Sequence, residues 1–266
     1  PEARGLEGGR RDHRLAGGRP FGKGLSMMRI AVVSDIHGSI RALEAVVADL
    51  DRRRPDLVVH GGDLGVNGPR PAEVIDLIRE LGWPGVLGNT DEMLWAPERL
   101  AEQEARAPKL RGLLHVLFEH TAPATADMLG EERVAWLKKL PTEWRHEEMV
   151  LLHASPGDLW RAPMPDADDE TIAEVYGGLR ARTIVYGHIH RPFVRNSGLT
   201  SGSIGLPYDG DWRPSYLLID EGGVSVERVE YDLEGEVADL LASGYPYASW
   251  LAEMRTAGTF RPPPTR

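Results

Sequence analysis

The feature that most constrains the fold is a repeated unit: a short apolar run, a glycine-containing turn with a carboxylate, and an amphipathic segment. Residues 28–35, MRIAVVSD, form the first run, and residues 55–63, PDLVVHGGD, form the second. Between them, apolar residues recur at helical spacing over 39–53. A second helix is expected over 71–82, followed by a third short strand and turn over 84–91. This βαβαβ order predicts parallel strands joined by helical crossovers.

The rest of the chain combines a helical middle with further short strands. The predicted segments are a mostly helical stretch over 91–140, a hairpin over 143–155, a helix over 166–179 and a strand over 181–190. Residues 192–231 show short alternating strands, which predict an antiparallel second half, and 236–255 return to helical spacing. We see no internal repeat and no linker that divides the chain.

A single domain is therefore expected over 27–255. Residues 1–26 are rich in glycine and arginine and are interpreted as a disordered leader, with the native start expected at Met27 or Met28. Residues 256–266 are interpreted as a C-terminal tail.

Composition limits the chemistry more than the fold. The chain has 266 residues, a net charge of −10 and no cysteine. The lack of thiols excludes disulfides, zinc–thiolate sites, iron–sulfur clusters and a cysteine nucleophile, so a metal must be held by nitrogen and oxygen. The acidic balance argues against a general nucleic-acid coat protein, although short oligonucleotides stay possible as substrates. No apolar run approaches the length of a membrane span, and a cytoplasmic location is expected.

Polar residues that can bind a metal through nitrogen or oxygen follow the predicted strands. They are Asp35 and His37 in SDIHG, Asp63 in GGD, Asn89 in GNTD, His153 in LLHAS, and His188 and His190 in GHIH. In an open α/β sheet, ligands gather beyond the carboxyl ends of the strands. Seven nitrogen and oxygen donors there could hold two divalent cations, and a mixture of histidine and carboxylate suits Mn, Fe, Zn or similar metals. Two cations about 3.5–4 Å apart need a bridging anion, for which Asp63 is the candidate because it stands alone at its turn.

These five motifs, in this order over residues 28–231, resemble those of the calcineurin-like metallophosphoesterases. The segments GDLGVNGPRP, AWLKKLP and SGSIGLPYDGD are similar to the bacterial and archaeal branch of small phosphodiesterases. The resemblance implies the metallo-dependent phosphatase fold, a four-layer α/β/β/α sandwich of two mixed sheets flanked by helices. It also implies a dimetal-dependent phosphoesterase, in the first place a phosphodiesterase that acts on small nucleotide-like substrates.

The resemblance further implies that the seven residues divide between two metals. The division is Asp35, His37 and His190 at the first metal, Asn89, His153 and His188 at the second, and Asp63 as the bridge. A water or hydroxide between the metals would attack phosphorus in line with the leaving group, because bound cations lower the pKa of water from 15.7 towards about 7. Mn²⁺ is the expected metal, with Fe, Zn, Ni or Co as alternatives.

One position departs from the family pattern. Many relatives carry a histidine at the position of Thr90, and that histidine is thought to act near the leaving-group oxygen. Since a threonine cannot supply a proton at neutral pH, we hypothesise a preference for easier leaving groups, as in aryl phosphodiesters, cyclic nucleotides or nucleoside polyphosphates. Alternatively, Asp91, His115 or His120 replaces the missing histidine. Thr90, Asp91, His120 and Arg213, which follows the turn PYDGDW, are the candidate substrate contacts.

Other functions stay open at this point. One alternative is a dinucleoside tetraphosphatase or a protein serine/threonine phosphatase of the same fold, although protein phosphatases usually keep the histidine that Thr90 replaces. Another is a scaffold that keeps the fold without the chemistry, although such relatives lose metal ligands. The expected partner is a small phosphorylated substrate, on whose base Trp95 or Trp160 could stack, and no membrane partner is expected. The sequence leaves the oligomeric state unknown.

Overall fold

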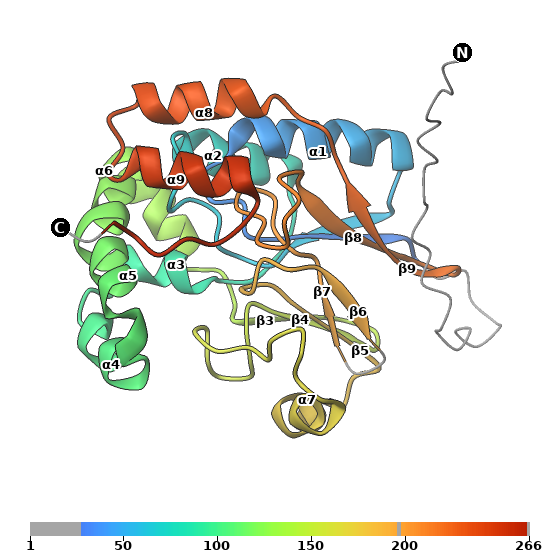
Figure 1. Ribbon diagram of the computed structural model, residues 1–266. Helices are drawn as coiled ribbons and strands as arrows, with labels where there is room; N and C mark the ends of the chain where they lie inside the picture. The colour runs from blue at the N-terminus through green and yellow to red at the C-terminus, as the bar shows by residue number, and fades with distance from the viewer. Residues whose placement is uncertain (1–27, 196–197, 265–266) are drawn as a thin grey trace, which may run out of the picture.

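The computed structural model describes residues 28–195 and 198–264, and the leader predicted over 1–26 lies outside this range (Figure 1). The elements of the first half are β1 (Ile30–Val33), α1 (Ile40–Arg53), β2 (Leu57–His60), α2 (Pro71–Leu81), α3 (Asn89–Met93), α4 (Arg99–Arg106), a 3₁₀ turn (Pro108–Leu110), α5 (Arg111–Val116), a π-helical turn (Leu117–Thr121) and α6 (Ala122–Leu137). Those of the second half are β3 (Glu143–His146), β4 (Met149–Leu152), α7 (Asp169–Tyr176), a 3₁₀ turn (Gly177–Leu179), β5 (Thr183–Tyr186), β6 (Phe193–Arg195), β7 (Gly198–Thr200), β8 (Ser215–Asp220), β9 (Gly223–Arg228), α8 (Leu233–Ala242) and α9 (Ala248–Ala257).

Two mixed sheets form the centre of the protein. The first has the strand order β2-β1-β8-β9, in which β1 and β2 are parallel and the other pairs are antiparallel. The second has the order β3-β4-β5-β7-β6, in which β4, β5 and β7 are parallel and the outer pairs are antiparallel. The predicted antiparallel pairing is correct for β6 with β7 and for β8 with β9, but these two hairpins belong to different sheets.

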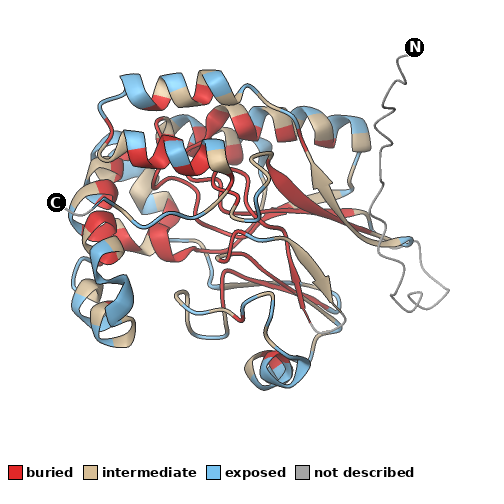
Figure 2. Ribbon diagram, in the orientation of Figure 1, coloured by how far each residue is buried: buried red, intermediate tan, exposed pale blue. Residues whose placement is uncertain are grey.

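Apolar side chains join the sheets and helices into four layers. Alternate residues of a strand face opposite sides, so Val33 packs against α1 and α2 whereas Val32 lies between the sheets with Leu151 of β4. The neighbouring Val150 packs with Ile172 of α7 on the outer side of the second sheet. In Figure 1, α1, α2, α8 and α9 lie on one side of the two sheets and α7 lies on the other, and Figure 2 shows the buried strands between them. The predicted α/β/β/α architecture is confirmed.

The backbone conformation contradicts one local prediction and divides the helical segment of another. In the stretch expected as a third strand, only Gly85 pairs with a strand residue, His60, because Leu87 donates its N–H to Pro141 instead. The helical spacing over 236–255 is divided between α8 and α9, since Gly244 lies at a φ of 71° and Pro246 follows it. Within the described ranges, no helix combines the length and apolar character needed to cross a bilayer.

The core between the sheets predicts a clear stability contrast. Leu151 is 0% exposed, so Leu151→Ala is expected to lower the free energy of unfolding by about 2–5 kcal/mol. Leu241 on α8 is 52% exposed, and Leu241→Ala is the matched control, with an expected change within about 0.5 kcal/mol. Urea denaturation followed by tryptophan fluorescence measures both. Equal losses in the two variants would contradict the placement of Leu151.

Candidate metal centre

The turns after four parallel strands and the start of one short helix bring the predicted ligands together. These residues are Asp35 and His37 after β1, Asp63 after β2, His153 after β4, His188 and His190 after β5, and Asn89 at the start of α3. Because the carboxyl ends of parallel strands meet at one edge of each sheet, and the two sheets face each other, the turns converge.

The backbone at these turns is strained. Five of the seven residues lie in the left-handed region, with φ values of 55° for Asp35, 51° for His37, 56° for Asp63, 68° for His188 and 55° for His190. Non-glycine residues rarely adopt this conformation, and each instance costs about 1–3 kcal/mol. Strain concentrated in a single cluster indicates a site kept for function rather than for stability.

The first half of the cluster contains two carboxylates and two imidazoles. Each of Asp35, His37, Asp63 and His190 is buried, and their ligand atoms lie within 4.8 Å of one another. His37 Nε2 is 3.2 Å from His190 Nε2 and 3.7 Å from Asp63 Oδ2. His190 Nε2 is 3.5 Å from Asp35 Oδ1. The nitrogen and oxygen atoms of these four side chains are close enough to bind one metal ion.

The second half shares a carboxylate with the first. Asn89 Oδ1 lies 2.8 Å from His153 Nε2 and 2.9 Å from His188 Nδ1. Asp63 Oδ1 lies 3.5 Å from His153 Nε2, while the other oxygen of Asp63 faces His37. The structure therefore brings all seven predicted residues into two adjoining groups, and Asp63 lies between the groups.

Backbone carbonyls orient three of the imidazoles. The Nδ1–H groups donate to carbonyl oxygens, from His37 to Val66 at 2.8 Å, from His153 to Gly61 at 2.7 Å and from His190 to Leu206 at 2.6 Å. A carbonyl oxygen can only accept, so the proton of each neutral ring lies on Nδ1 and the Nε2 lone pair faces the cluster. Metal-binding histidines are commonly oriented in this way.

The electrostatics of the cluster fit divalent cations. Burial, followed by the charge of Asp63, raises the pKa of Asp35 well above its usual value, and burial raises the pKa of Asp63 to about 6. Burial also lowers the pKa of His37 to about 3 and those of His153 and His188 to about 4. The imidazoles therefore stay unprotonated, and the carboxylates lack a compensating positive charge. Asp35 Oδ2 is buried without a hydrogen-bond partner among the described residues, so the donor set suits a cation bound by nitrogen and oxygen.

Two of the candidate substrate contacts also support the shared carboxylate, and their contact with substrate stays a prediction. Asp91 is buried and accepts backbone N–H groups from Asp63 at 2.9 Å, Leu64 at 2.9 Å and Gly88 at 3.1 Å. The N–H of Thr90 donates to Asp63 Oδ1 at 2.9 Å. Both oxygens of Asp91 are thus engaged in ordering the turn that carries Asp63.

Arg213 forms ion pairs outside the cluster. Its guanidinium lies 2.6 Å from Asp211 Oδ2 and 3.5 Å from Glu230 Oε1. The hydrogen bond from Arg213 lowers the pKa of Asp211. A role for Arg213 in substrate binding stays a prediction.

The two histidines of the helical middle also have partners of their own. His115 Nδ1 lies 3.0 Å from Glu119 Oε1, and the bond with Glu119, together with Glu104, raises the pKa of His115. The ring of His120 lies 5.4 Å from the ring of Tyr247. Their proposed replacement of the family histidine likewise stays a prediction.

Helix α9 and the segment that precedes it contact the turns that carry the predicted ligands. Arg255 of α9 is 1% exposed, and its Nη2 donates to the carbonyls of Asn67 at 2.8 Å and His37 at 3.2 Å. Tyr245 Oη accepts the N–H of Asn67 at 2.9 Å. The nearest carboxylate to Arg255 is that of the buried Glu236, 3.9 Å away. Because more than 170 residues separate Tyr245 and Arg255 from Asn67 and His37, sequence spacing carried no signal for these contacts.

Another contact that the sequence did not reveal involves Tyr208. Its ring stacks on the ring of His190 with centroids 4.4 Å apart and an angle of 8° between the planes. The N–H of Tyr208 donates to the carbonyl of His190 at 3.0 Å. The aromatic ring therefore covers one face of a predicted ligand.

The two mixed sheets and the Asp–His cluster at their edge are those of a metallophosphoesterase. Residues 28–222 match the calcineurin-like phosphoesterase superfamily domain, and the chain belongs to that superfamily. Its members depend on two metals, and the chain is a phosphoester hydrolase, as the motifs predicted.

Relatives cover most of the chain. A Methanocaldococcus jannaschii protein described as uncharacterized is 29% identical over 251 residues, which cover 84% of this chain and 96% of that protein. A probable cyclic nucleotide phosphodiesterase from Synechococcus is 27% identical over 217 residues, covering 68% of this chain and 83% of that protein. The crystal structure of a metallophosphoesterase from Sphaerobacter thermophilus superposes with a TM-score of 0.70 at 25% identity, covering 87% of this chain and 99% of that one.

The contacts of Arg255 predict an effect on metal binding as well as on stability. Arg255→Met leaves two carbonyls without their donor, so we expect Mn²⁺ affinity, measured by calorimetry on folded protein, to fall about 10–100-fold. Leu251→Ala is the control, because Leu251 is fully buried on the same helix and should lose stability without losing Mn²⁺ affinity. Adding Glu236→Gln removes the unpaired buried charge if Arg255→Met alone does not fold. Unchanged affinity in a folded Arg255 variant would contradict the assignment.

Proposed function

We propose that the protein is a dimetal-dependent phosphodiesterase that acts on small nucleotide-like substrates. The observation that carries this proposal is the position of Asp63, one oxygen of which faces His37 and the other His153. A carboxylate between two groups of ligand atoms matches a site for two adjacent cations, the arrangement used for in-line displacement at phosphorus.

The proposed roles follow the two halves of the cluster. Asp35, His37 and His190 hold one metal, Asn89, His153 and His188 hold the other, and Asp63 is shared. Mn²⁺ is the expected ion. When bound, the two cations lower the pKa of a water molecule and offset the negative charge of the phosphoryl oxygens.

The chain's own residues keep the site in one arrangement. The backbone carbonyls of Val66, Gly61 and Leu206 hold the imidazoles in the tautomer that directs Nε2 inward. The carboxylate of Asp91 holds the turn of Asp63 through three N–H groups. Because these groups are fixed before substrate arrives, little reorganisation is needed during the reaction.

The preference for diesters rests on Thr90 and on a relative. By the resemblance of GNTD to the family motif, Thr90 stands where many relatives carry a histidine, and its side chain cannot act as a general acid at neutral pH. Esters with easier leaving groups need that acid least. The probable cyclic nucleotide phosphodiesterase among the relatives points to the same substrate class. The cytoplasmic location expected from the sequence stays a prediction.

A metal-dependence assay tests the proposed function. We expect chelator-treated protein to be inactive on bis-(p-nitrophenyl) phosphate and Mn²⁺ to restore hydrolysis. Asp63→Asn should lower kcat/KM by about 100-fold or more, because the shared charge is lost. Asp76→Asn is the control, since Asp76 pairs with Arg133 on the surface and should leave activity within about twofold. Protein shown to hold two Mn²⁺ per chain that hydrolyses no phosphoester would instead support the scaffold alternative.

The Thr90 hypothesis makes a separate prediction about leaving groups. Thr90→His should raise kcat/KM for an alkyl phosphoester about 10²-fold and change that for the matching aryl ester little, because only the alkyl leaving group needs a proton. Thr90→Ser, which keeps a hydroxyl, should leave the ratio unchanged. Metal content measured in each variant separates a lost site from an altered reaction. If the ratio of kcat/KM for the alkyl ester to that for the aryl ester is unchanged in metal-loaded Thr90→His, Thr90 does not determine the leaving-group preference.

A further inference from the structure

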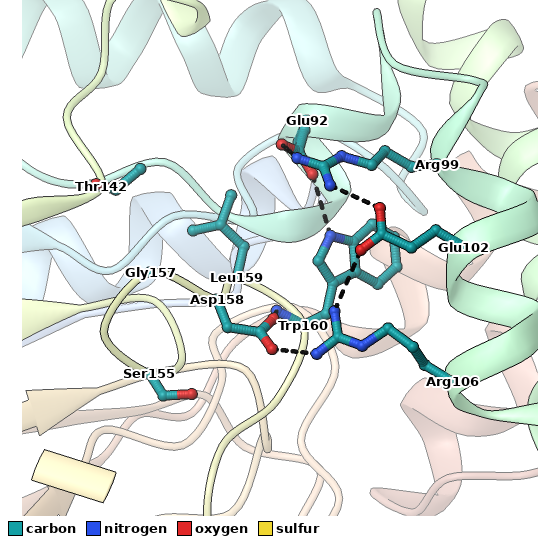
Figure 3. A pocket seen from close by; sticks show the side chains of 10 residues that line it. All are labelled: Glu92, Arg99, Glu102, Arg106, Thr142, Ser155, Gly157, Asp158, Leu159 and Trp160. Carbon is teal, nitrogen blue, oxygen red and sulfur yellow. Dashed lines mark hydrogen bonds and ion pairs between the residues drawn. The ribbon is translucent and has the colours of Figure 1, made fainter.

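A cavity of about 410 Å³ lies between α3, α4 and the loop that follows His153 (Figure 3). Its charged and aromatic lining consists of Glu92, Arg99, Glu102, Arg106, Asp158 and Trp160. Glu92 lies in α3, the helix that begins at the predicted metal ligand Asn89, so this part of the lining is three residues from the metal cluster.

The cavity adjoins the second half of the metal cluster. Burial lowers the pKa of His188, and the backbone of Trp160 and the charge of Asp158 oppose this shift, so both lining residues lie near that imidazole. Ser155, another lining residue, stands two positions after His153. A phosphate held at the cluster would therefore direct one of its ester groups towards this cavity.

The polar side chains of the lining form a closed ring of contacts, which the dashed lines of Figure 3 trace in part. The indole Nε1–H of Trp160 donates to Glu92 at 3.0 Å, and Glu92 lies 3.4 Å from Arg99. Glu102 lies 2.7 Å from Arg99 and 3.6 Å from Arg106. Arg106 pairs with Asp158, which accepts the backbone N–H of Trp160 at 2.8 Å and so closes the ring. Each of the two guanidiniums is thus already paired with two carboxylates.

The charge of this ring decides which group it can receive. Among the residues that line the cavity, three carboxylates face two guanidiniums, and neither arginine is free to bind a further phosphate. Arg161, whose charge also acts on Asp158, does not line the cavity. The carboxylates would repel a phosphate but not an uncharged heterocycle. The N–H groups on the edge of such a ring can donate to the carboxylates, and its ring nitrogens can accept from the guanidiniums. Trp160 adds an aromatic surface fixed by stacking on Phe118, with ring centroids 5.5 Å apart at 9°.

We propose that this cavity binds the nucleobase of a substrate with a single phosphodiester and selects against substrates that carry additional phosphates. This inference rests on the proposed phosphodiesterase function and specifies its substrate. It favours a cyclic nucleotide over a dinucleoside tetraphosphate, whose extra phosphates would meet Glu92, Glu102 and Asp158.

A neutralising substitution tests the charge selection. Glu102→Gln releases both guanidiniums from a shared carboxylate, so we expect the ratio of KM for a dinucleoside tetraphosphate to KM for a cyclic nucleotide to fall about tenfold. Glu98→Gln is the control, because it makes the same charge change just before α4 but does not line the cavity. The Glu102 effect should shrink as salt concentration rises. Equal effects of the two substitutions, or none from Glu102→Gln, would overturn the charge selection.

Binding without turnover tests the nucleobase site separately from the proposed function. Adenosine, which has no phosphate, should give saturation-transfer NMR signals from its base protons with the full chain. Those signals should be lost in Trp160→Ala and partly kept in Trp160→Phe, since base–aromatic stacking is the main attraction. Adenosine binding that is equal in wild type and Trp160→Ala, or absent in wild type, would overturn the nucleobase site. Failure of Mn²⁺ to support hydrolysis would overturn the phosphodiesterase function instead.

Discussion

The arrangement of the site depends on one buried carboxylate, that of Asp63. Its two oxygens face imidazoles from different parts of the chain, His37 after β1 and His153 after β4. The turn that carries it is held by Asp91, and it passes so close to Gly88 that a Cβ there would lie 2.1 Å from Asp63 Oδ1. The two sheets therefore have to meet at this point, because the turns after the strands of each sheet supply three of the seven predicted ligands.

Such a centre is costly for the folded protein. Left-handed backbone at five ligand positions and buried carboxylates with a raised pKa both oppose folding at neutral pH when no cation is present. The apolar layers on both sides of the sheets offset this cost, and Arg255 of α9 and Tyr245, in the segment between α8 and α9, add polar contacts to the turns. A cation that binds only the folded state would stabilise the protein further by mass action.

The parts that the sequence predicted are those with local signals. The helices α1 and α2 follow from apolar spacing, and the seven cluster residues stand in short motifs of glycine and polar residues at strand ends or, for Asn89, at the start of a helix. Contacts made only by folding carry no such signal: Arg255 meets His37 across 218 residues, and the ring around Trp160 joins two helices to a distant loop. The expected third strand was wrong because Pro141, far along the chain, takes the N–H of Leu87.

Anomalous diffraction from crystals grown with Mn²⁺ tests the central claim most directly. The account predicts two manganese peaks on either side of the Asp63 carboxylate, one within bonding distance of Asp35, His37 and His190 and the other within bonding distance of Asn89, His153 and His188. A single peak that Asp63 does not touch, or no peak at saturating Mn²⁺, would contradict it.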